Sequence, residues 1–400
     1  MAVSAEPAQR GTPEQAVAGR VLVIEQGGRG GVADYTAELA RALAAQGWLV
    51  ALATADDHLF QVADGVTLHP VFHYVRGHGR MARAIRRLGL GPAVNALRFM
   101  LALPRLLGLA RRVDVIHTEG WEYAPLGVLA MAVLRLARVP IVQTSHNTFE
   151  RGRSLDRSHA WLARMSAHTI VHTQADLARV PSTAAGRVSV IPHGEYGGLA
   201  REGGAADRDE ARIELGIAPS AAVTLLFGQL RPDKGLGDTL AAVARLPDLH
   251  LLVAGEERGA LAAAAAQLAD PRLAGRVTVR EGFLDMSEAA KLFAATDTVV
   301  LPYMVASQSG VLLLAYGFAR PVVVYPVGGL LEAVVDGETG WICARPDVDA
   351  LVVALGQATA AGWGECERRG RAGARLAEER YAWPAIARLT GEVYRSLQVV

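Results

Sequence analysis

The sequence predicts an α/β protein with two doubly wound domains, each built on a parallel sheet. Short apolar runs alternate with helix-like segments, a pattern typical of a parallel sheet that helices cover on both faces. The alternation stops after Gly194 and restarts at residue 223. A chain of 400 residues is also too long for one ordinary domain. We therefore expect two domains of similar size, with ligands bound in the cleft between them.

The apolar runs give the expected strands, and the segments with helical periodicity give the expected helices. In the first half, strands are expected at 21–24, 49–53, 113–117, 140–144, 167–173 and 188–192, and helices at 32–46 and 124–138. In the second half, strands are expected at 223–227, 250–254, 277–280, 298–302 and 322–325, and helices at 239–246, 261–269, 287–295, 311–318, 348–360 and 383–397. The resulting division is a disordered leader over 1–19, a first domain over 20–196, a linker over 197–209 and a second domain over 210–383. The C-terminal helix, 384–400, is assigned to the first domain.

Composition limits the expected partners and location. The 41 basic and 40 acidic residues leave a net charge of +1, so no global field favours nucleic acid. Two cysteines are too few for a disulfide framework, and the first residues lack the apolar segment of a signal peptide, so we expect a cytoplasmic protein. The uncharged stretch 298–319 contains Pro302 and a polar centre, which argues against a membrane-spanning helix.

Two motifs have the composition of phosphate-binding loops. Gly30 and Gly31 end a glycine-rich turn between the first strand and the first helix, where backbone N–H groups can approach an anion. In the second domain, Arg231 and Lys234 lie three residues apart ahead of a helix, and two cations there can hold a diphosphate. Only two of the 41 basic residues are lysines, which gives Lys234 added weight. The alternative interpretation of the glycine-rich segment is a plain tight turn, and that of Arg231 and Lys234 is two solvated surface charges.

Two further motifs follow strand ends. Ser309 and Gly310 precede the helix at 311–318 and expose its first N–H groups, although simple helix capping explains them too. His146 follows the strand at 140–144, and a histidine at the carboxyl end of a strand points into the cleft. A buried structural histidine is the alternative.

Taken in order, the motifs resemble those of the family 4 glycosyltransferases, whose fold is GT-B. They are G-G-x-G-G near the start, H-N after a strand, I-P-H-G before the linker, G-x-L-R-P-D-K-G at 228–235 and a P-V-V…G-G-x-x-E…D-G-x-T-G series at 321–340. The similarity covers the chain from about residue 21 to the C-terminal helix. The H-N-x-x-x-E, I-P-H-G and S-Q-S-G-V segments are similar to a bacterial branch that assembles polysaccharides and glycoconjugates.

The resemblance implies two Rossmann-like domains facing across a cleft, with a nucleotide-diphosphate-sugar as co-substrate. Arg231, Lys234 and His146 are then the expected catalytic residues, two on the diphosphate and the histidine on the donor sugar. Further residues are implied in sugar-donor binding: Gly30, Gly31, Gly282, Phe283, Leu284, Ser307, Gln308, Ser309, Gly310, Val311 and Glu332. Asn147 and Glu150 are expected on the acceptor side.

The sequence departs from the family at two positions. The family carries two glutamates eight residues apart, and alignment on Pro321 puts Ala306 and Leu314 there. Neither side chain can accept a hydrogen bond, and Gln308 or Ser307 is the expected substitute near the sugar. Retention of anomeric configuration, the family default, is therefore an expectation, with inversion left open.

No metal cofactor is expected. Asp347 and Asp349 spell the D-x-D metal motif of another glycosyltransferase class, but they open the helix at 348–360. A carboxylate at a helix start caps the helix and complements its dipole, so we expect capping. The histidines lack the spacing of a zinc site.

A basic segment precedes the third expected strand. Residues 65–113 contain no Asp or Glu and nine arginines, from Arg76 to Arg112, interleaved with apolar side chains. A basic amphipathic segment can lie on an anionic membrane, which predicts a peripheral location at its inner face. An ordinary packed helix with a solvated face is the alternative.

The leading expectation is a metal-independent glycosyltransferase that moves a sugar to a sugar or lipid-linked acceptor. A non-catalytic sugar-nucleotide-binding relative is the second reading, since both family glutamates are missing. A pseudo-glycosidic coupling enzyme of secondary metabolism is the third.

Overall fold

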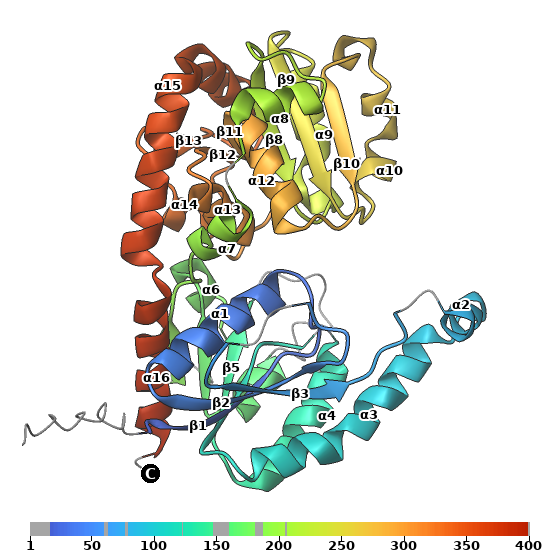
Figure 1. Ribbon diagram of the computed structural model, residues 1–400, viewed down its shortest axis with the longest axis vertical. Coiled ribbons are helices and arrows are strands. Elements are labelled where there is room, and N and C mark those ends of the chain that lie inside the picture. The colour runs from blue at the N-terminus through green and yellow to red at the C-terminus, as the bar shows by residue number, and fades with distance from the viewer. Residues whose placement is uncertain are drawn as a thin grey trace, which may run out of the picture.

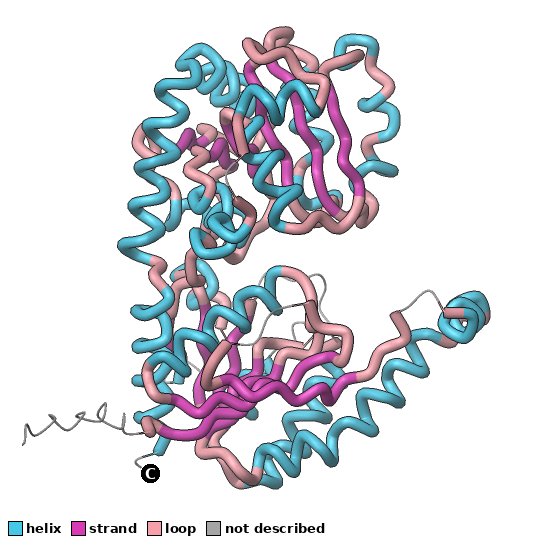
Figure 2. The backbone as a smooth tube through the Cα atoms, in the orientation of Figure 1, coloured by secondary structure: helices cyan, strands magenta, loops and turns pink. Residues whose placement is uncertain are grey.

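The computed structural model describes residues 17–59, 63–76, 79–121, 123–146, 160–180, 187–204 and 206–398. These residues form two domains, each with one parallel sheet between layers of helices (Figure 1, Figure 2). The first sheet has seven strands in the order β3-β2-β1-β4-β5-β6-β7, and the second has six in the order β10-β9-β8-β11-β12-β13. The predicted fold class, two doubly wound parallel-sheet domains, is confirmed. Most of the leader expected over 1–19 lies outside the described residues.

All strands of the first sheet except β3 carry the expected apolar runs. The strands of this sheet are β1 (Gly19–Ile24), β2 (Trp48–Ala55), β3 (Val66–Phe72), β4 (Val115–Thr118), β5 (Ile141–Ser145), β6 (His168–Val171) and β7 (Val188–Val190). The sequence did not predict β3, which contains Pro70 and has a mostly half-buried pattern. Proline is tolerated there because β3 is an edge strand, where one side of the ladder needs no partner.

The second sheet consists of β8 (Ala222–Phe227), β9 (Leu249–Gly255), β10 (Val277–Glu281), β11 (Thr298–Leu301), β12 (Val322–Val324) and β13 (Gly340–Ile342). Its central strands β8, β9 and β11 are almost wholly buried, because helices pack on both faces of the sheet. Strand β13 has three residues, too few to give a sequence pattern.

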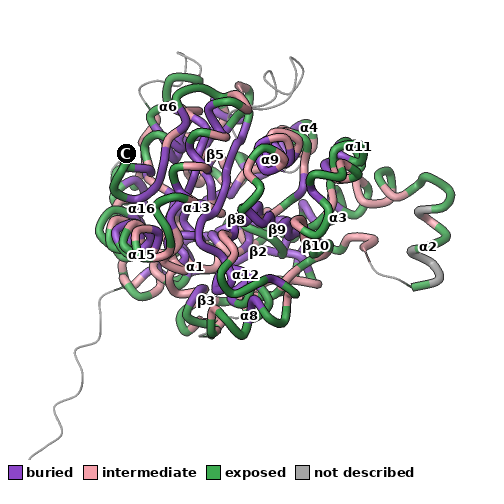
Figure 3. Tube along the Cα trace, turned by 90° about the horizontal axis from the view of Figure 1, so that it is seen from above, coloured by how far each residue is buried: buried purple, intermediate pink, exposed green. Residues whose placement is uncertain are grey.

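The helices of the first domain are α1 (Gly31–Ala45), α2 (Arg80–Arg87), α3 (Gly91–Ala110), α4 (Ala124–Leu134) and α6 (Gln174–Leu177). Helices α2 and α3 form an arm that projects from the first domain (Figure 1), and much of α2 is exposed (Figure 3). One face of α3 still packs on the domain core through Phe99, Leu103 and Leu106. Among the described helices, α3 is long and apolar enough to cross a membrane, by length and composition alone.

The helices of the second domain follow a segment that was expected to be a plain linker. They are α7 (Gly197–Glu202), α8 (Arg208–Glu214), α9 (Leu236–Val243), α10 (Ala260–Ala263), α11 (Ala265–Leu268), α12 (Met286–Ala295), α13 (Gly310–Gly317), α14 (Leu330–Ala333) and α15 (Val348–Arg380). Helix α7 lies inside the expected linker, because Leu199 packs on the core of the second domain and Ala200 is buried.

The chain returns to the first domain at its end. Helix α15 runs beside the second domain, with a break at Gly362, whose φ is 74°. Helix α16 (Trp383–Gln398) then packs against α1 in the first domain. At the crossing, Trp383 donates a hydrogen bond of 2.8 Å from Nε1 to the Glu195 carbonyl. A side chain at Gly194 would meet the Trp383 ring at 2.4 Å, so only glycine fits there.

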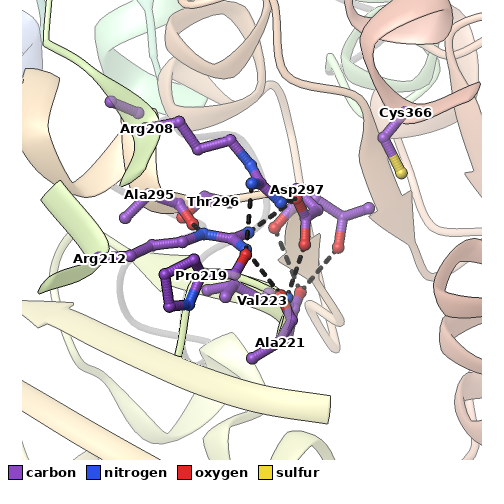
Figure 4. Close-up of polar contacts among 12 residues, drawn as sticks. Arg208, Arg212, Pro219, Ala221, Val223, Ala295, Thr296, Asp297 and Cys366 are labelled. Atoms are coloured by element: carbon purple, nitrogen blue, oxygen red, sulfur yellow. Dashed lines mark hydrogen bonds and ion pairs between the residues drawn. The ribbon is translucent and has the colours of Figure 1, made fainter. Parts of the chain in front are cut away.

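A buried ionic cluster fixes the amino ends of β8 and β11 (Figure 4). Asp297 accepts hydrogen bonds from Arg212 at 2.8 Å, from Arg208 at 3.1 Å and from the Val223 N–H at 2.8 Å. The fully buried Arg212 also donates from Nε to the Ala295 carbonyl at the end of α12. This cluster lies at the end of the sheet opposite to the strand ends that bind ligands, so its role is structural.

Candidate active site

The glycine-rich turn of the first domain opens toward free space. Gly30 is the N-cap of α1 and has φ of 80°, a conformation that favours glycine. A Cβ added at Gly30 or Gly31 would meet no atom within 4 Å. The N-terminus of α1 is therefore accessible to an anion through its backbone N–H groups. Glu25 holds the turn from below by accepting from the Gly27 and Gly28 N–H groups, both at 2.7 Å.

Both expected diphosphate ligands of the second domain interact with Tyr303, Arg231 through its charge and Lys234 over the ring face. Arg231 pairs with Asp233 through two hydrogen bonds of 2.9 and 2.6 Å, and this pairing lowers the pKa of Asp233. Lys234 Nζ lies 3.5 Å from the centre of the Tyr303 ring. Burial raises the pKa of Tyr303 to about 12, although hydrogen bonding to Ser309 opposes the shift. Tyr303 thus links the cationic loop to the start of α13.

The loop after β8 and the loop after β11 form one unit. The Met304 N–H donates to the Asp233 carbonyl at 3.1 Å. Gly235 has φ of 76°, and a side chain there would come within 2.2 Å of the Pro302 carbonyl oxygen. The chain can therefore turn here only with glycine, which is why glycine follows Lys234.

The N-termini of α1 and α13 approach the same side chain. Ser309 caps α13 by accepting from the Leu312 N–H at 3.2 Å. Tyr196 donates from its hydroxyl to the Gly31 carbonyl at 3.3 Å, and its ring would lie 3.1 Å from a Cβ at Gly310. Two helix N-termini, one from each domain, thus lie on either side of Tyr196. Both favour negative charge nearby.

Two polar contacts hold the two domains together. Ser307, expected in sugar-donor binding, donates to Asp176 in α6 at 2.7 Å. Glu332, also expected there, accepts from the Gln174 and Ala175 N–H groups at 3.0 and 3.1 Å. In this conformation both side chains serve the contact between domains. A cavity of about 430 Å³ lies beside them, with lining from both domains that includes His172, His193, Gln308 and Arg380.

The remaining expected donor residues lie at the same edge of the second sheet. Val311 follows Gly310 in α13, and its Cγ2 would lie 3.2 Å from a Cβ at Gly228. Gly282, with φ of 131°, follows β10. Strand β10 is two strands from β8 in the sheet, a distance of roughly 10 Å. Phe283 is 67% exposed, whereas Leu284 packs on the domain core.

His146 belongs to a buried cluster that the sequence reading did not assemble. Its Nε2 lies 2.9 Å from Glu119 Oε2 and its Nδ1 lies 3.2 Å from His172 Nε2. Tyr35 packs its ring edge-on against His146, with centroids 4.8 Å apart. Burial lowers the pKa of His146 to about 3 and raises the pKa of Glu119. Both ring nitrogens of His146 are therefore engaged inside the first domain.

Several residues singled out in the sequence lie outside the described residues or have a structural role. Asn147 and Glu150 lie outside the described residues. Ala306 and Leu314, at the family's glutamate positions, are buried in the apolar core of the second domain. Asp347 caps α15 by accepting from the Ala350 N–H at 2.8 Å, which confirms the predicted capping role.

The residues that sequence reasoning missed lie within three positions after the end of a strand. They are Glu119 after β4, His172 after β6, His193 after β7 and Tyr303 after β11. In a parallel sheet these positions meet at one edge, so their place after apolar runs was the available signal. Tyr35 and Tyr196, which complete the set, carried no such signal.

Two Rossmann-like domains that face each other with their strand ends define the GT-B class. Among solved structures, Anabaena Alr3699/HepE in complex with UDP and glucose superposes with a TM-score of 0.73 at 18% identity, covering 94% of this chain and 100% of that one. At that identity the likeness shows the fold alone.

Family models and relatives identify the family. Residues 30–194 match the glycosyl transferase 4-like domain, and residues 221–360 match the glycosyl transferases group 1 model. Glycogen synthase of Mycobacterium tuberculosis is 31% identical over 301 residues, which are 71% of this chain and 69% of the relative. The chain therefore belongs to the group 1 glycosyltransferases. D-inositol 3-phosphate glycosyltransferase of Mycobacterium marinum is also 31% identical, over 60% of this chain; the match spans just over half, 54%, of that relative.

Proposed function

We propose that this chain transfers a sugar from a nucleotide-diphosphate-sugar to a sugar or lipid-linked acceptor in polysaccharide or glycoconjugate assembly. The observation that carries the proposal is the convergence of Arg231, Lys234 and the α13 N-terminus around Tyr303. Such a site suits a diphosphate, because cations and helix N–H groups both favour phosphate oxygens. The names of the relatives, a glycosyltransferase and a glycogen synthase, support the same reaction class.

The proposed reaction breaks the bond between the anomeric carbon and the diphosphate and forms a bond to an acceptor hydroxyl oxygen. Negative charge develops on the leaving diphosphate, and Arg231, Lys234 and the Ser309–Gly310 N–H groups stabilise it. The hydroxyl proton passes to the leaving phosphate. The proposal includes retention of anomeric configuration, which is the family default. Anomeric analysis of the product tests this part, and an inverted product would contradict it.

Metal independence is also part of the proposal. The positive charges of Arg231 and Lys234 supply at the diphosphate what a divalent cation would supply. Among the described residues, no cluster of three or more histidine, cysteine or acidic side chains has the arrangement of a metal site. Transfer should therefore persist in EDTA, and complete loss that manganese or magnesium restores would overturn this part.

The test of the proposal is a panel of UDP, GDP, ADP and their sugars. A ligand that binds the native state raises its stability by about 2.7 kcal/mol at a hundredfold excess over Kd, so thermal shifts identify the nucleotide. The matching radiolabelled sugar donor is then incubated with the protein and candidate acceptors. Transfer or release of labelled sugar supports the enzyme. A thermal shift without sugar release would support the alternative, a non-catalytic sugar-nucleotide-binding protein, which the apolar Ala306 and Leu314 favour.

The projecting arm supports an anionic membrane as the place where a lipid-linked acceptor is met. Large apolar side chains on this arm are exposed: Leu88, Leu90, Leu97, Met100 and Leu101. Arginines beside them are exposed as well: Arg83, Arg87, Arg98, Arg105, Arg111 and Arg112. Arg76 differs from the expected set, because it pairs with Asp57 at 3.7 Å and lies over the Tyr74 ring. We therefore assign the membrane-facing role to the exposed arginines and not to Arg76.

Sedimentation with vesicles tests this surface. The protein should sediment with anionic vesicles and not with neutral ones, and added salt should weaken binding, since exposed charges are screened beyond about 8 Å at physiological ionic strength. Serine substitutions at Leu97, Leu101, Arg83 and Arg87 should abolish binding to anionic vesicles. Serines at Arg258 and Arg272, two exposed arginines of the second domain, are the control. Equal partitioning with both vesicle types, or none, would contradict a membrane role and leave a cytoplasmic protein with a soluble acceptor.

A further inference from the structure

A chain of hydrogen bonds links Glu119, His146 and His172 beneath the cleft. The hydrogen bond at the His172 end of the chain decides which atom is the donor in each of the others. His172 Nδ1 lies 3.0 Å from the Ile191 carbonyl oxygen, which can only accept, so Nδ1 carries the hydrogen. A neutral His172 then has a bare Nε2, and the hydrogen in the 3.2 Å contact must come from His146 Nδ1.

The same reasoning reaches the carboxyl group. A neutral His146 with its hydrogen on Nδ1 has a bare Nε2, which needs a donor. The atom that faces it is Glu119 Oε2, at 2.9 Å. The hydrogen in this contact must therefore belong to Glu119, unless the pair is ionised as carboxylate and imidazolium.

The surroundings decide between the two forms. The Glu119 side chain is fully buried, and among the described residues its Oε1 has no partner within hydrogen-bond distance, since His117 Nε2 lies 3.6 Å away. Burial outweighs the charge of His117 and hydrogen bonding to Thr144, which both lower the pKa of Glu119. A buried carboxylate with one bare oxygen is poorly stabilised, whereas a carboxylic acid tolerates it. Among the described residues, the groups that face His146 are Glu119, His172 and Tyr35, with His117 close by, and no described lysine or arginine contacts the pair. Burial raises the pKa of Glu119 and lowers that of His146, which agrees with the uncharged form.

We propose that Glu119 is a positioning residue for the cleft histidine: it is held as the uncharged acid and donates its proton to His146 Nε2. The ring is thereby fixed as one neutral tautomer with both nitrogens used inside the first domain. His146 then stays a neutral ring beneath the cleft and does not take the proton of the acceptor hydroxyl. The inference rests on the proposed function only for its catalytic consequence, because the protonation state itself can be measured without turnover.

Infrared difference spectroscopy at neutral pH tests the protonation directly. The difference spectrum of wild type minus Glu119→Gln should contain the carbonyl band of a protonated carboxylic acid, because the variant has lost that group. Glu25→Gln is the matched control: Glu25 is also buried after a first-domain strand, but both its oxygens accept N–H groups, so its replacement should remove carboxylate bands only. Loss of carboxylate bands alone in Glu119→Gln would overturn the proposal.

Nitrogen NMR of the histidine-labelled wild type reads the tautomer in the native protein, and a His146→Gln sample serves only to assign the signal. The signal absent from a His146→Gln sample should report a protonated Nδ1 and a bare Nε2 at pH 7. Two protonated nitrogens, or the opposite tautomer, would contradict the proposal.

Transfer assays add the functional readout. Glu119→Gln keeps a neutral N–H donor, so its transfer rate should be at least tenfold higher than that of Glu119→Ala. The wild-type pH–rate profile should lack a histidine inflection between pH 5 and 8. Equal losses in the two variants would overturn the positioning role. If wild type itself transfers no sugar, the proposed function fails, and the infrared and NMR results still decide the state of Glu119.

Discussion

The ammonium group of Lys234 lies 3.5 Å from the centre of the Tyr303 ring, although the two residues belong to loops that follow different strands. The ring face attracts the cation and leaves Lys234 close to Arg231 and to the start of α13. Tyr303 thus positions one of the few lysines in an arginine-rich chain at the place proposed for the diphosphate.

Replacing Tyr303 should weaken sugar-donor binding in proportion to what is removed. Tyr303→Phe keeps the ring below Lys234 and loses only the hydroxyl that contacts Ser309. Tyr303→Leu also loses the cation–π contact, which contributes about 0.5–2 kcal/mol. Calorimetric titration with the nucleotide sugar should show a Kd increase of roughly 2- to 30-fold for the leucine variant and less for phenylalanine. Equal affinity in Tyr303→Leu and wild type would contradict the role of the ring.

Removing the Glu332 carboxylate should loosen the contact between domains. Glu332→Ala leaves the Gln174 and Ala175 N–H groups at the start of α6 without their acceptor. We expect a larger radius of gyration in X-ray scattering and a several-fold weaker affinity for the sugar donor. Glu338→Ala, which removes an exposed carboxylate nearby, is the control and should change neither quantity. Unchanged scattering and affinity in Glu332→Ala would show that the contact does not hold the domains in the arrangement described.

The Asp297 cluster should govern stability without affecting the site. Asp297→Ala leaves the buried Arg212 charge uncompensated, and breaking a buried pair in this way costs about 3–5 kcal/mol. Asp349→Ala breaks the exposed pair with Arg245 and should cost at most about 1 kcal/mol. Chemical denaturation measures both variants. A loss for Asp297→Ala no larger than for Asp349→Ala would contradict the structural role.

Acid should destabilise the protein steeply between pH 6.5 and 4.5. Burial lowers the pKa values of His117, His146, His172 and His193, to about 3 for His146 and His172, so the unfolded chain binds protons that the native chain does not. Their stabilisation is present above pH 6.5 and is lost as the pH falls toward the folded values. Asp34, Glu38 and Glu119 oppose this, because burial raises their pKa values, that of Asp34 to about 6. The lowered pKa values of His168 and His250 add to the loss.

The net uptake of two to three protons predicts a fall of about 3–4 kcal/mol per pH unit in this window. Denaturant titrations at pH 7.5, 6 and 5 measure the free energy of unfolding. A flat profile over that range would mean that the histidines are not buried as neutral rings.

The fold was predictable because buried parallel strands are short apolar runs, and a second series of them restarts near residue 223. The edge strand β3 and the three-residue β13 were missed, since neither gives a continuous apolar run. The loops that carry Arg231, Lys234 and Ser309 were predictable from glycine and charge after a strand. Their placement around Tyr303 is a finding of the structure.

Contacts between distant residues could not be predicted. Ser307 and Asp176 are 131 positions apart and join different domains, and Glu332 and Gln174 are 158 apart. Such pairs depend on how the domains dock, which no local pattern encodes. The roles of Asn147 and Glu150 stay predictions from the family resemblance.

The most direct test of the central claim is sugar transfer from the labelled donor by Lys234→Ala and Arg231→Ala. Each variant loses charge-assisted contacts to the leaving diphosphate, worth about 1.5–3 kcal/mol, which corresponds to a loss of roughly 10- to 150-fold in kcat/KM. Lys291→Ala is the matched control, because Lys291 is the other lysine and pairs with Glu214 on the surface. We predict that Lys291→Ala keeps wild-type transfer while the two site variants lose it and retain their circular dichroism. Wild-type transfer by both site variants would contradict the assignment of the sugar-donor site.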